Sequence, residues 1–193
     1  MTARVMRADA ARNHDRIVVA AAEAFEELGA GVALDEVARR AGVGVATLYR
    51  RFRNRDQLVR AVLEHVVATE IQPATAIGHD EPWRELVATL EALVESVASH
   101  RTVLAVAHEA GAIDVDMVES YLSWLDRLLR RALDAGVVRP ELRARDLAAV
   151  VVMALATADD RDPGGADRRR YLALLIDGLR PAPGLLPPPS DAV

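Results

Sequence analysis

The sequence predicts an all-α protein of about nine helices, and three features support that prediction. Apolar residues make up 51% of the 193 residues and aromatics only 4%, so Ala, Val and Leu must fill the core, a mixture that suits packed helices. Apolar residues recur at spacings of three and four along most of the chain. No segment shows the alternation that is typical of a half-buried strand.

The N-terminal segment begins with residues 1–8, which we expect to form a flexible arm that includes Arg4 and Arg7. A first helix is predicted from about Ala10 to Leu28, because its apolar positions follow the spacing of one buried stripe. These positions are Ile17, Ala21, Ala24, Phe25 and Leu28. Gly29 is expected to end this helix.

Two short helices are predicted next, over 34–41 and 45–52, with Gly42 in the turn between them. A fourth helix is expected from Arg55 to about Ile71, with Asn54 as its cap and Pro73 as its end. Further helices are predicted over 82–99, 102–109, 114–135, 143–158 and 166–179. A surface loop is expected over 159–165, and residues 181–193 are expected to form a flexible, Pro-rich tail.

The domain organisation follows from these elements. We expect a three-helix unit with a helix-turn-helix in residues 10–71, joined through the fourth helix to a helical body over 72–180. Charge is distributed unevenly between the two, because residues 1–60 contain 11 Arg and 8 Asp or Glu, whereas the rest contain 13 Arg and 21 acidic residues. A basic end on an acidic body is consistent with nucleic-acid binding, although surface charge varies widely.

The segment 33–52 contains the most informative pattern. Ala38 supplies the small residue that two tightly crossing helices require, and Gly42 tolerates the backbone angles of the turn. The apolar residues spaced to seal the angle between the helices are Val37, Ala41, Val43 and Leu48. The outer face then presents Thr47, Tyr49, Arg50 and Arg53, whose hydroxyl and guanidinium groups can reach phosphates and base edges. The pattern therefore predicts a helix-turn-helix that binds double-stranded DNA.

This segment resembles the TetR family of bacterial regulators. The resemblance covers roughly the first 60 residues and rests on the order and spacing of residues 34–52 and 54–58, after a matching first helix. It implies an all-α homodimer with two recognition helices in successive major grooves and a C-terminal pocket for an inducer. Residues 44, 45 and 53 depart from the family pattern, in which Ser, a polar residue such as Lys, and Pro are common at these three positions.

Two arguments give the residues expected to contact DNA: exposure on the outer face, and the resemblance to the family. The resemblance implies that Arg55 matches a basic residue that binds phosphate. The expected residues are Val43, Gly44, Val45, Thr47, Leu48, Tyr49, Arg50, Arg53 and Arg55. The expected mechanism is repression from a palindromic operator, with half-sites about 34–36 Å apart, and release by a small-molecule ligand. Activation instead of repression is the alternative mechanism.

The ligand pocket is expected in the helical body, because several large side chains lie there on otherwise apolar helices. The candidates are Trp83, Leu90, His108, Met117, Tyr121 and Trp124, with Met153 in a similar setting. Plain core packing is the alternative for these residues.

The dimer interface is expected on the last two helices. Residues 147–156 are apolar nearly all round, so a helix there must be buried on every side. The body of the same chain could cover it, but we favour packing against a second copy. The interface residues expected are Leu147, Val151, Leu155, Tyr171, Leu174 and Leu175.

Other functional classes are less consistent with the sequence. It contains no Cys, no assembled catalytic group, no cofactor motif and no close metal-ligand pair, so we expect no enzyme, cofactor or metal. No apolar run is long enough to span a membrane and no signal sequence is evident, so a cytoplasmic protein is expected. A helical scaffold or interaction protein without a DNA role is an alternative. The outer face of residues 45–53 distinguishes the two, because only a DNA-binding protein requires that face to contact DNA.

Overall fold

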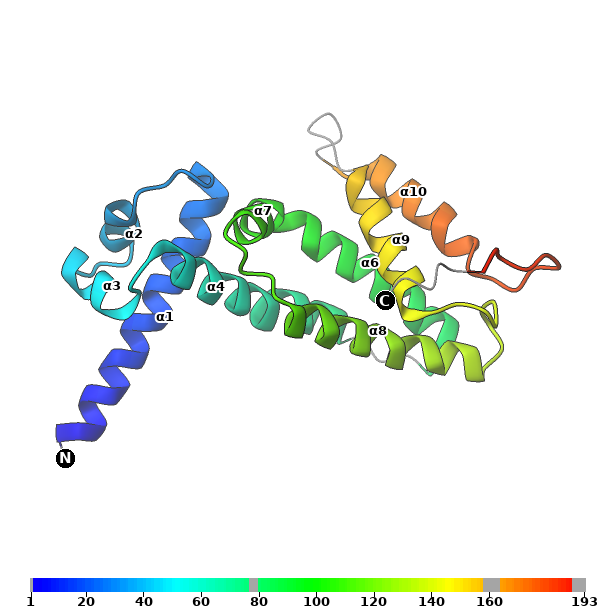
Figure 1. Ribbon diagram of the computed structural model, residues 1–193, viewed down its shortest axis with the longest axis horizontal. Helices are drawn as coiled ribbons and strands as arrows, with labels where there is room; N and C mark the ends of the chain where they lie inside the picture. The colour runs from blue at the N-terminus through cyan, green and yellow to red at the C-terminus, as the bar shows by residue number, and fades with distance from the viewer. Residues whose placement is uncertain (1, 77–79, 158–163, 189–193) are drawn as a thin grey trace. The chain divides into compact units, whose positions relative to one another are not determined.

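The computed structural model describes residues 2–76, 80–157 and 164–188, and every regular element in these ranges is helical. The predicted all-α fold class is confirmed. The chain divides into two compact units (Figure 1). Unit 1 comprises Met1–Pro73 and Ser99–Val115, and unit 2 comprises Ala74–Ala98 and Asp116–Val193. The predicted domain boundary at residues 71–72 stays a prediction. The compact units are not continuous in sequence, because the segment 99–115 groups with the N-terminal helices.

Unit 1 is built around α1 (Thr2–Leu28) and α4 (Arg55–Val66). The elements α2 (Leu34–Arg40), α3 (Val45–Arg51) and α7 (Arg101–Glu109) complete it. Its core consists of small and aliphatic side chains from all these helices, with Phe25 fully buried at the end of α1. The cap predicted for α4 is confirmed, because the Asn54 side chain accepts a hydrogen bond of 3.0 Å from the backbone N–H of Gln57.

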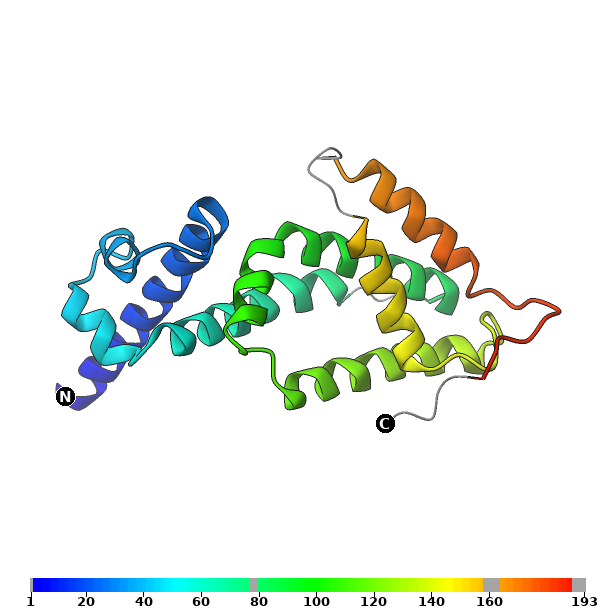
Figure 2. The same cartoon turned by 45° about the horizontal axis from the view of Figure 1, so that its top comes forward.

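Unit 2 contains α6 (Pro82–Ser99, with Ser99 at the unit boundary), α8 (Val115–Asp134), α9 (Ala144–Ala156) and α10 (Ala166–Asp177). Helices α9 and α10 lie side by side in both Figure 1 and Figure 2. Two ion pairs link α6 to its neighbours: Glu85 binds Arg131 of α8, and Glu95 binds Arg168 of α10. These two ion pairs link three helices of the unit to one another.

Three details of the helices differ from the prediction. Residues 2–8 continue α1 instead of forming an arm, since the segment contains no Gly or Pro that would interrupt a helix. Leu28 is 53% exposed, because it lies at the end of α1 beyond the buried stripe. Pro73 does not end the helix: a π-helical segment, η1 (Val67–Ile71), leads into α5 (Gln72–Thr75). A π-helical segment shifts the hydrogen-bond register, and this accommodates the missing N–H of proline.

The two irregular segments near the C-terminus are only partly described. Of the predicted loop 159–165, residues 159–163 lie outside the described residues, and Gly165 precedes α10 with a φ of +66°. Residues 181–188 of the predicted tail have no helix, but hydrogen bonds tie this segment to the loop after α8. Arg139 donates to the carbonyl of Gly184 at 2.6 Å, and Glu141 accepts from the N–H of Leu186 at 3.0 Å. This second contact lowers the pKa of Glu141.

Within the described residues, no helix has both the length and the apolar character needed to cross a membrane.

Candidate nucleic-acid interface and ligand cavity

The turn between α2 and α3 is tight and depends on Gly42. This residue has a φ of +63°, and the N–H of Val43 donates to the carbonyl of Ala38 at 3.0 Å. The crossing is sealed by side chains that are almost fully buried: Val37, Ala38, Ala41 and Leu48. The predicted helix-turn-helix geometry is therefore present, with the small residue and the glycine where the sequence placed them.

Arg16 of α1 holds this turn, a role that the sequence analysis missed. Its Nη2 donates to the carbonyl oxygens of Ala41 at 2.5 Å and Gly42 at 3.2 Å. A Cβ at Gly42 would lie only 2.6 Å from that nitrogen. The turn is thus fixed both by its own backbone and by a cation from a helix more than twenty residues earlier in the chain.

His14 of α1 anchors the C-terminal end of α3. Its ring stacks on Phe52 with centroids 5.2 Å apart, and its Nδ1 accepts a hydrogen bond of 3.0 Å from Nε of Arg51. An accepting Nδ1 requires that this nitrogen carry no proton. Burial lowers the pKa of His14, and the positive charge of Arg51 lowers it further. The neutral imidazole therefore positions α3.

The basic residues of α2 are neutralised by acidic neighbours. Glu36 accepts from Arg39 at 2.6 Å and from Arg40 at 2.9 Å, and these bonds lower the pKa of Glu36 to about 2. Arg40 also binds Glu27 of α1 at 2.7 Å. These two arginines therefore add little net positive charge, which leaves α3 and the residues after it as the main basic surface of the motif.

The outer face of α3 is open to solvent. Tyr49 is 49% exposed and Val45 is 39% exposed, and Gly44, Arg50 and Arg53 are also exposed. Thr47 and Val43 are half-buried, and the Thr47 hydroxyl accepts a bond of 3.1 Å from Arg50. These residues are therefore accessible in whole or in part, and their contact with DNA stays a prediction.

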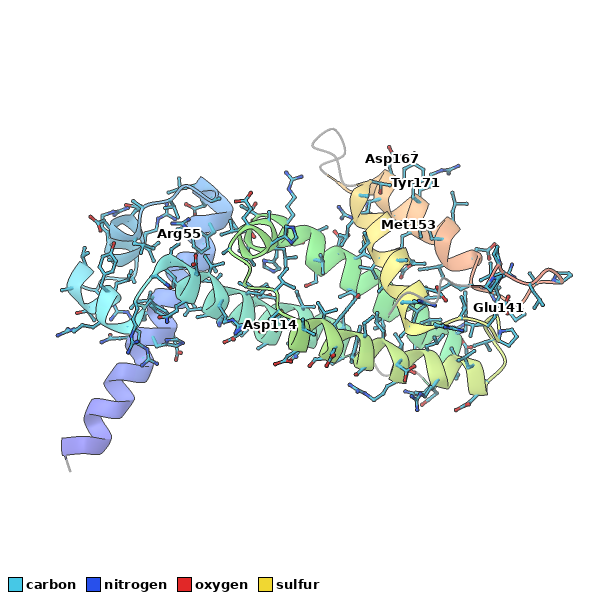
Figure 3. The ribbon with its side chains drawn as sticks, viewed as in Figure 1. Arg55, Asp114, Glu141, Met153, Asp167 and Tyr171 are labelled. Carbon is cyan, nitrogen blue, oxygen red and sulfur yellow. The ribbon has the colours of Figure 1, made fainter. Side chains whose placement is uncertain are left out.

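Two of the residues expected to contact DNA have another role in the structure. Leu48 has no exposed surface, because it fills the angle between α2 and α3, so its side chain cannot contact DNA. The Arg55 guanidinium binds the carbonyls of Val32 at 2.7 Å and of Ala30, and lies 5.2 Å from the ring centroid of Phe25 (Figure 3). Arg55 thus links the loop between α1 and α2 to α4. This structural role explains an arginine at position 55 without any contact with a DNA phosphate.

Unit 2 contains a cavity of about 330 Å³ that opens to solvent. Polar and apolar side chains line it: Thr75, Ala76, Glu85, Thr89, Trp124, Arg127, Leu128 and Arg131. Glu85 and Thr89 lie one turn apart on α6 and are 8% and 2% exposed. Glu85 binds Nη1 of Arg131 at 2.5 Å through Oε1, and its Oε2 is buried with no hydrogen-bond partner in the described structure. No group of His, Asp and Glu in the described residues could hold a metal ion.

Of the predicted pocket residues, only Trp124 lines this cavity. Tyr121 stacks on Trp124 with centroids 6.0 Å apart, and burial raises the pKa of Tyr121 to about 12. Met117 is half-buried and does not line the cavity. Leu90 is fully buried in the core. Trp83 lies under the guanidinium of Arg180, 4.0 Å from the ring centroid, and His108 is exposed on α7 of unit 1.

Helices α9 and α10 expose a largely apolar surface that we call the α9–α10 face. On α9 its residues follow helical spacing: Ala149, Val152, Met153 and Ala156. Tyr171 and Leu174 of the neighbouring helix α10 are also exposed, and Figure 3 labels Met153 on α9 and Tyr171 on α10. Two predicted interface residues are not part of this face, because Leu147 and Val151 are buried within the chain. Leu155 and Leu175 are half-buried.

Comparisons with known proteins agree with this architecture. Residues 17–62 match the family model "Bacterial regulatory proteins, tetR family", and residues 81–181 match "Transcriptional regulator SbtR-like, C-terminal domain". A curated relative, the HTH-type transcriptional regulator SrpR of Pseudomonas putida, is 29% identical over 145 residues, which cover 69% of this chain and 67% of SrpR.

Solved structures give the same result over nearly the whole chain. A TetR transcriptional regulator from Streptomyces coelicolor is 30% identical with a TM-score of 0.64, over 87% of this chain and 98% of that one. A TetR regulatory protein from Mycobacterium vanbaalenii is 29% identical with a TM-score of 0.64, over 91% and 99% of the two chains. The matched proteins are described as transcriptional regulators. The chain therefore belongs to the TetR family, as a DNA-binding transcriptional regulator with a helix-turn-helix over α2 and α3.

Proposed function

We propose that this protein is a repressor that binds a palindromic operator as a homodimer and is released by a small-molecule ligand. The observation that supports this most directly is the face of α3, where Tyr49 and Arg50 are exposed while Leu48 is fully buried. A helix held by its inner side and polar on its outer side is suited to the major groove. The seven residues of α3 span about 10 Å, which fits a groove about 12 Å wide.

The side chains on this face divide by chemistry. Arg50 and Arg53 can pair with phosphate or with guanine, and the hydroxyls of Thr47 and Tyr49 can donate to phosphate. Val45 offers an apolar contact to a thymine methyl. A regulator bound through this face covers both groove and backbone of its site, so steric exclusion of the transcription machinery is the simplest outcome and favours repression.

The α9–α10 face supports the homodimer. Val152 is 65% exposed and Leu174 is 63% exposed, and exposed apolar side chains that cluster are typical of an interface. Because the same face on two copies can pair about a two-fold axis, it gives a dimer whose symmetry matches a palindrome. Asp167, which Figure 3 labels with Tyr171 on α10, and Arg170 are both exposed and can supply the polar edge that such an interface requires.

The cavity in unit 2 supports release by a ligand. It combines apolar surface from Trp124 and Leu128 with buried polar groups, which is typical of small-molecule sites. A ligand releases DNA only to the extent that it binds more tightly to the state in which the two α3 helices do not fit the operator.

Selection from a random DNA pool tests the proposed function. The full chain is incubated with the pool at low and at moderate salt, and bound DNA is sequenced. We expect an enriched palindrome whose half-site centres are about one helical turn apart, with affinity that falls steeply as salt rises. Failure to enrich any sequence, with protein that is folded and dimeric, would contradict a sequence-specific function.

Substitutions separate dimerisation from folding. Leu174→Glu introduces a charge into the α9–α10 face and should yield a monomer by analytical ultracentrifugation, with much weaker operator binding. Leu185→Glu is the matched control, because Leu185 is 82% exposed and lies outside that face. A Leu174→Glu protein that remains dimeric would exclude the α9–α10 face as the interface.

A further inference from the structure

We propose that the cavity of unit 2 binds a hydroxylated organic acid, meaning a small molecule with one negative charge, an apolar body and a hydroxyl donor. This inference rests on the proposed function, since it assigns a chemical class to the ligand that releases DNA. Three properties of the lining support it: its net charge, one carboxylate oxygen without a partner, and its apolar wall.

The lining has one acidic and two basic side chains, so its net charge is positive. Glu85 is paired with Arg131 through Oε1. Arg127 is exposed at the same cavity and forms no ion pair with any of the described residues. A ligand with a single negative charge would therefore find a cation that is not already engaged, whereas a cationic ligand would meet net repulsion.

The second carboxylate oxygen of Glu85 requires a hydrogen-bond donor. Oε2 is buried and has no partner in the described part of the chain, and a buried acceptor left without a donor is unfavourable. Glu85 itself lines the cavity, and the terminal torsion of glutamate is soft, so rotation of the carboxylate can present an oxygen to a ligand. Thr89, one turn further along α6, places a hydroxyl at the same cavity. A ligand hydroxyl can donate to Glu85 and accept from Thr89, which a purely apolar ligand cannot do.

The apolar part of the lining, which we call the apolar wall, comes from α8, the helix that also supplies Arg127 and Arg131. In this wall Trp124 and Leu128 lie one turn apart, and the ring of Tyr121 stacks on Trp124. A flat apolar body can pack against this wall, and aromatic rings gain further from an offset stack on the indole. The volume of about 330 Å³ is at the lower end of the range of ligand sites, which favours a compound of one or two rings.

A matched series of probes tests these three properties by calorimetry on the full chain without DNA. The acids are 4-hydroxybenzoate, 4-hydroxyphenylacetate and 3-(4-hydroxyphenyl)propionate, which vary the distance between hydroxyl and carboxylate. Each is paired with the same acid lacking the hydroxyl, and tyramine replaces the carboxylate of the longest acid with an ammonium. We expect at least one hydroxy acid to bind, its partner without the hydroxyl to bind about tenfold more weakly, and tyramine more weakly still.

A variant pair assigns the binding to this cavity. Arg127→Gln should weaken the best acid by about fivefold or more and remove its advantage over tyramine. Arg130→Gln is the control, because Arg130 lies three residues after Arg127 on the same helix and is 72% exposed. Its guanidinium pairs with Asp126, and it does not line the cavity. Melting temperatures of both variants establish that they are folded.

The outcomes distinguish this inference from the proposed function, because calorimetry does not involve DNA. Absence of binding by every hydroxy acid, equal affinity with and without the hydroxyl, or tyramine binding as tightly as the acid would overturn the inference. Release is then measured separately, by adding the best acid to the complex with the selected operator. Binding without release would leave the inference standing and would contradict release by this ligand, while binding with release supports both.

Discussion

Gly42 offers a direct test of how the helix-turn-helix is held, through the substitution Gly42→Ala. The residue has a φ of +63°, where a side chain is strained, and its added Cβ would lie 2.6 Å from Nη2 of Arg16. Gly29 is a natural control. It has a φ of +77°, but a Cβ there would meet nothing within 4 Å. The two substitutions therefore share the backbone strain and differ in the contact with Arg16.

The expected magnitudes follow from that difference. A left-handed backbone at alanine costs about 1–2 kcal/mol, which is the expected loss for Gly29→Ala. In Gly42→Ala the Arg16 side chain must also move, and it then loses its hydrogen bonds to the carbonyls of Ala41 and Gly42. That loss adds about 1 kcal/mol. Gly42→Ala should therefore reduce the free energy of unfolding by about 2–3 kcal/mol.

Urea unfolding at one fixed protein concentration measures both variants. A third protein, Arg16→Ala, and its combination with Gly42→Ala complete a double-mutant cycle. Because Arg16 is then absent, Gly42→Ala should cost no more in that background than Gly29→Ala does in the wild-type chain. If Gly42→Ala and Gly29→Ala destabilise the wild-type chain equally, the clamp by Arg16 makes no contribution and the reasoning is refuted.

Three further predictions concern pH and capping. The pKa of His14 is lowered from 6.5, so the contribution of His14 to the free energy of unfolding should be present above pH 6.5 and be lost as the pH falls through its folded-state pKa. The urea midpoint of His14→Gln should lose this pH dependence, whereas that of a His108→Gln control should keep it. Glu36 should titrate with a pKa of about 2 by carboxyl NMR, with its stabilising contribution present above pH 4.5 and lost toward pH 2, and Arg39→Gln should raise that pKa. Asn54→Ala should lower the free energy of unfolding by about 1 kcal/mol, and a change within error would exclude the cap.

The helix-turn-helix could be predicted from the sequence because its determinants are local. Ala38 and Gly42 are required by the crossing of two adjacent helices, and both lie within the motif. The residues that hold it from outside could not be found in the same way. Arg16 binds backbone carbonyls, which every residue has, so the partner residues give no sequence signal for this contact. His14 forms a hydrogen bond with Arg51, which lies 37 positions later in the chain.

The C-terminal predictions show where periodicity fails. The segment 147–156 is apolar nearly all round, so the pattern cannot say which side faces the body of the same chain. The structure buries Leu147 and Val151 and exposes Val152 and Met153. Most of the cavity lining was missed for a related reason, although Trp124 was among the expected residues. Its charged residues, Glu85 and Arg131, resemble ordinary surface residues of amphipathic helices until α6 and α8 are placed together.

The central claim, that α3 reads DNA, is tested most directly by the salt dependence of operator affinity for the wild-type chain and two arginine variants. Arg50→Ala removes a cation from the outer face of α3, whereas Arg84→Ala removes an 80% exposed cation from α6 of unit 2. We predict that Arg50→Ala weakens operator binding by about tenfold or more and, where Arg50 contacts phosphate, reduces the slope of log K against log salt by about 1. Arg84→Ala should leave both quantities unchanged. Equal affinity and slope for Arg50→Ala and the wild-type chain would contradict the claim.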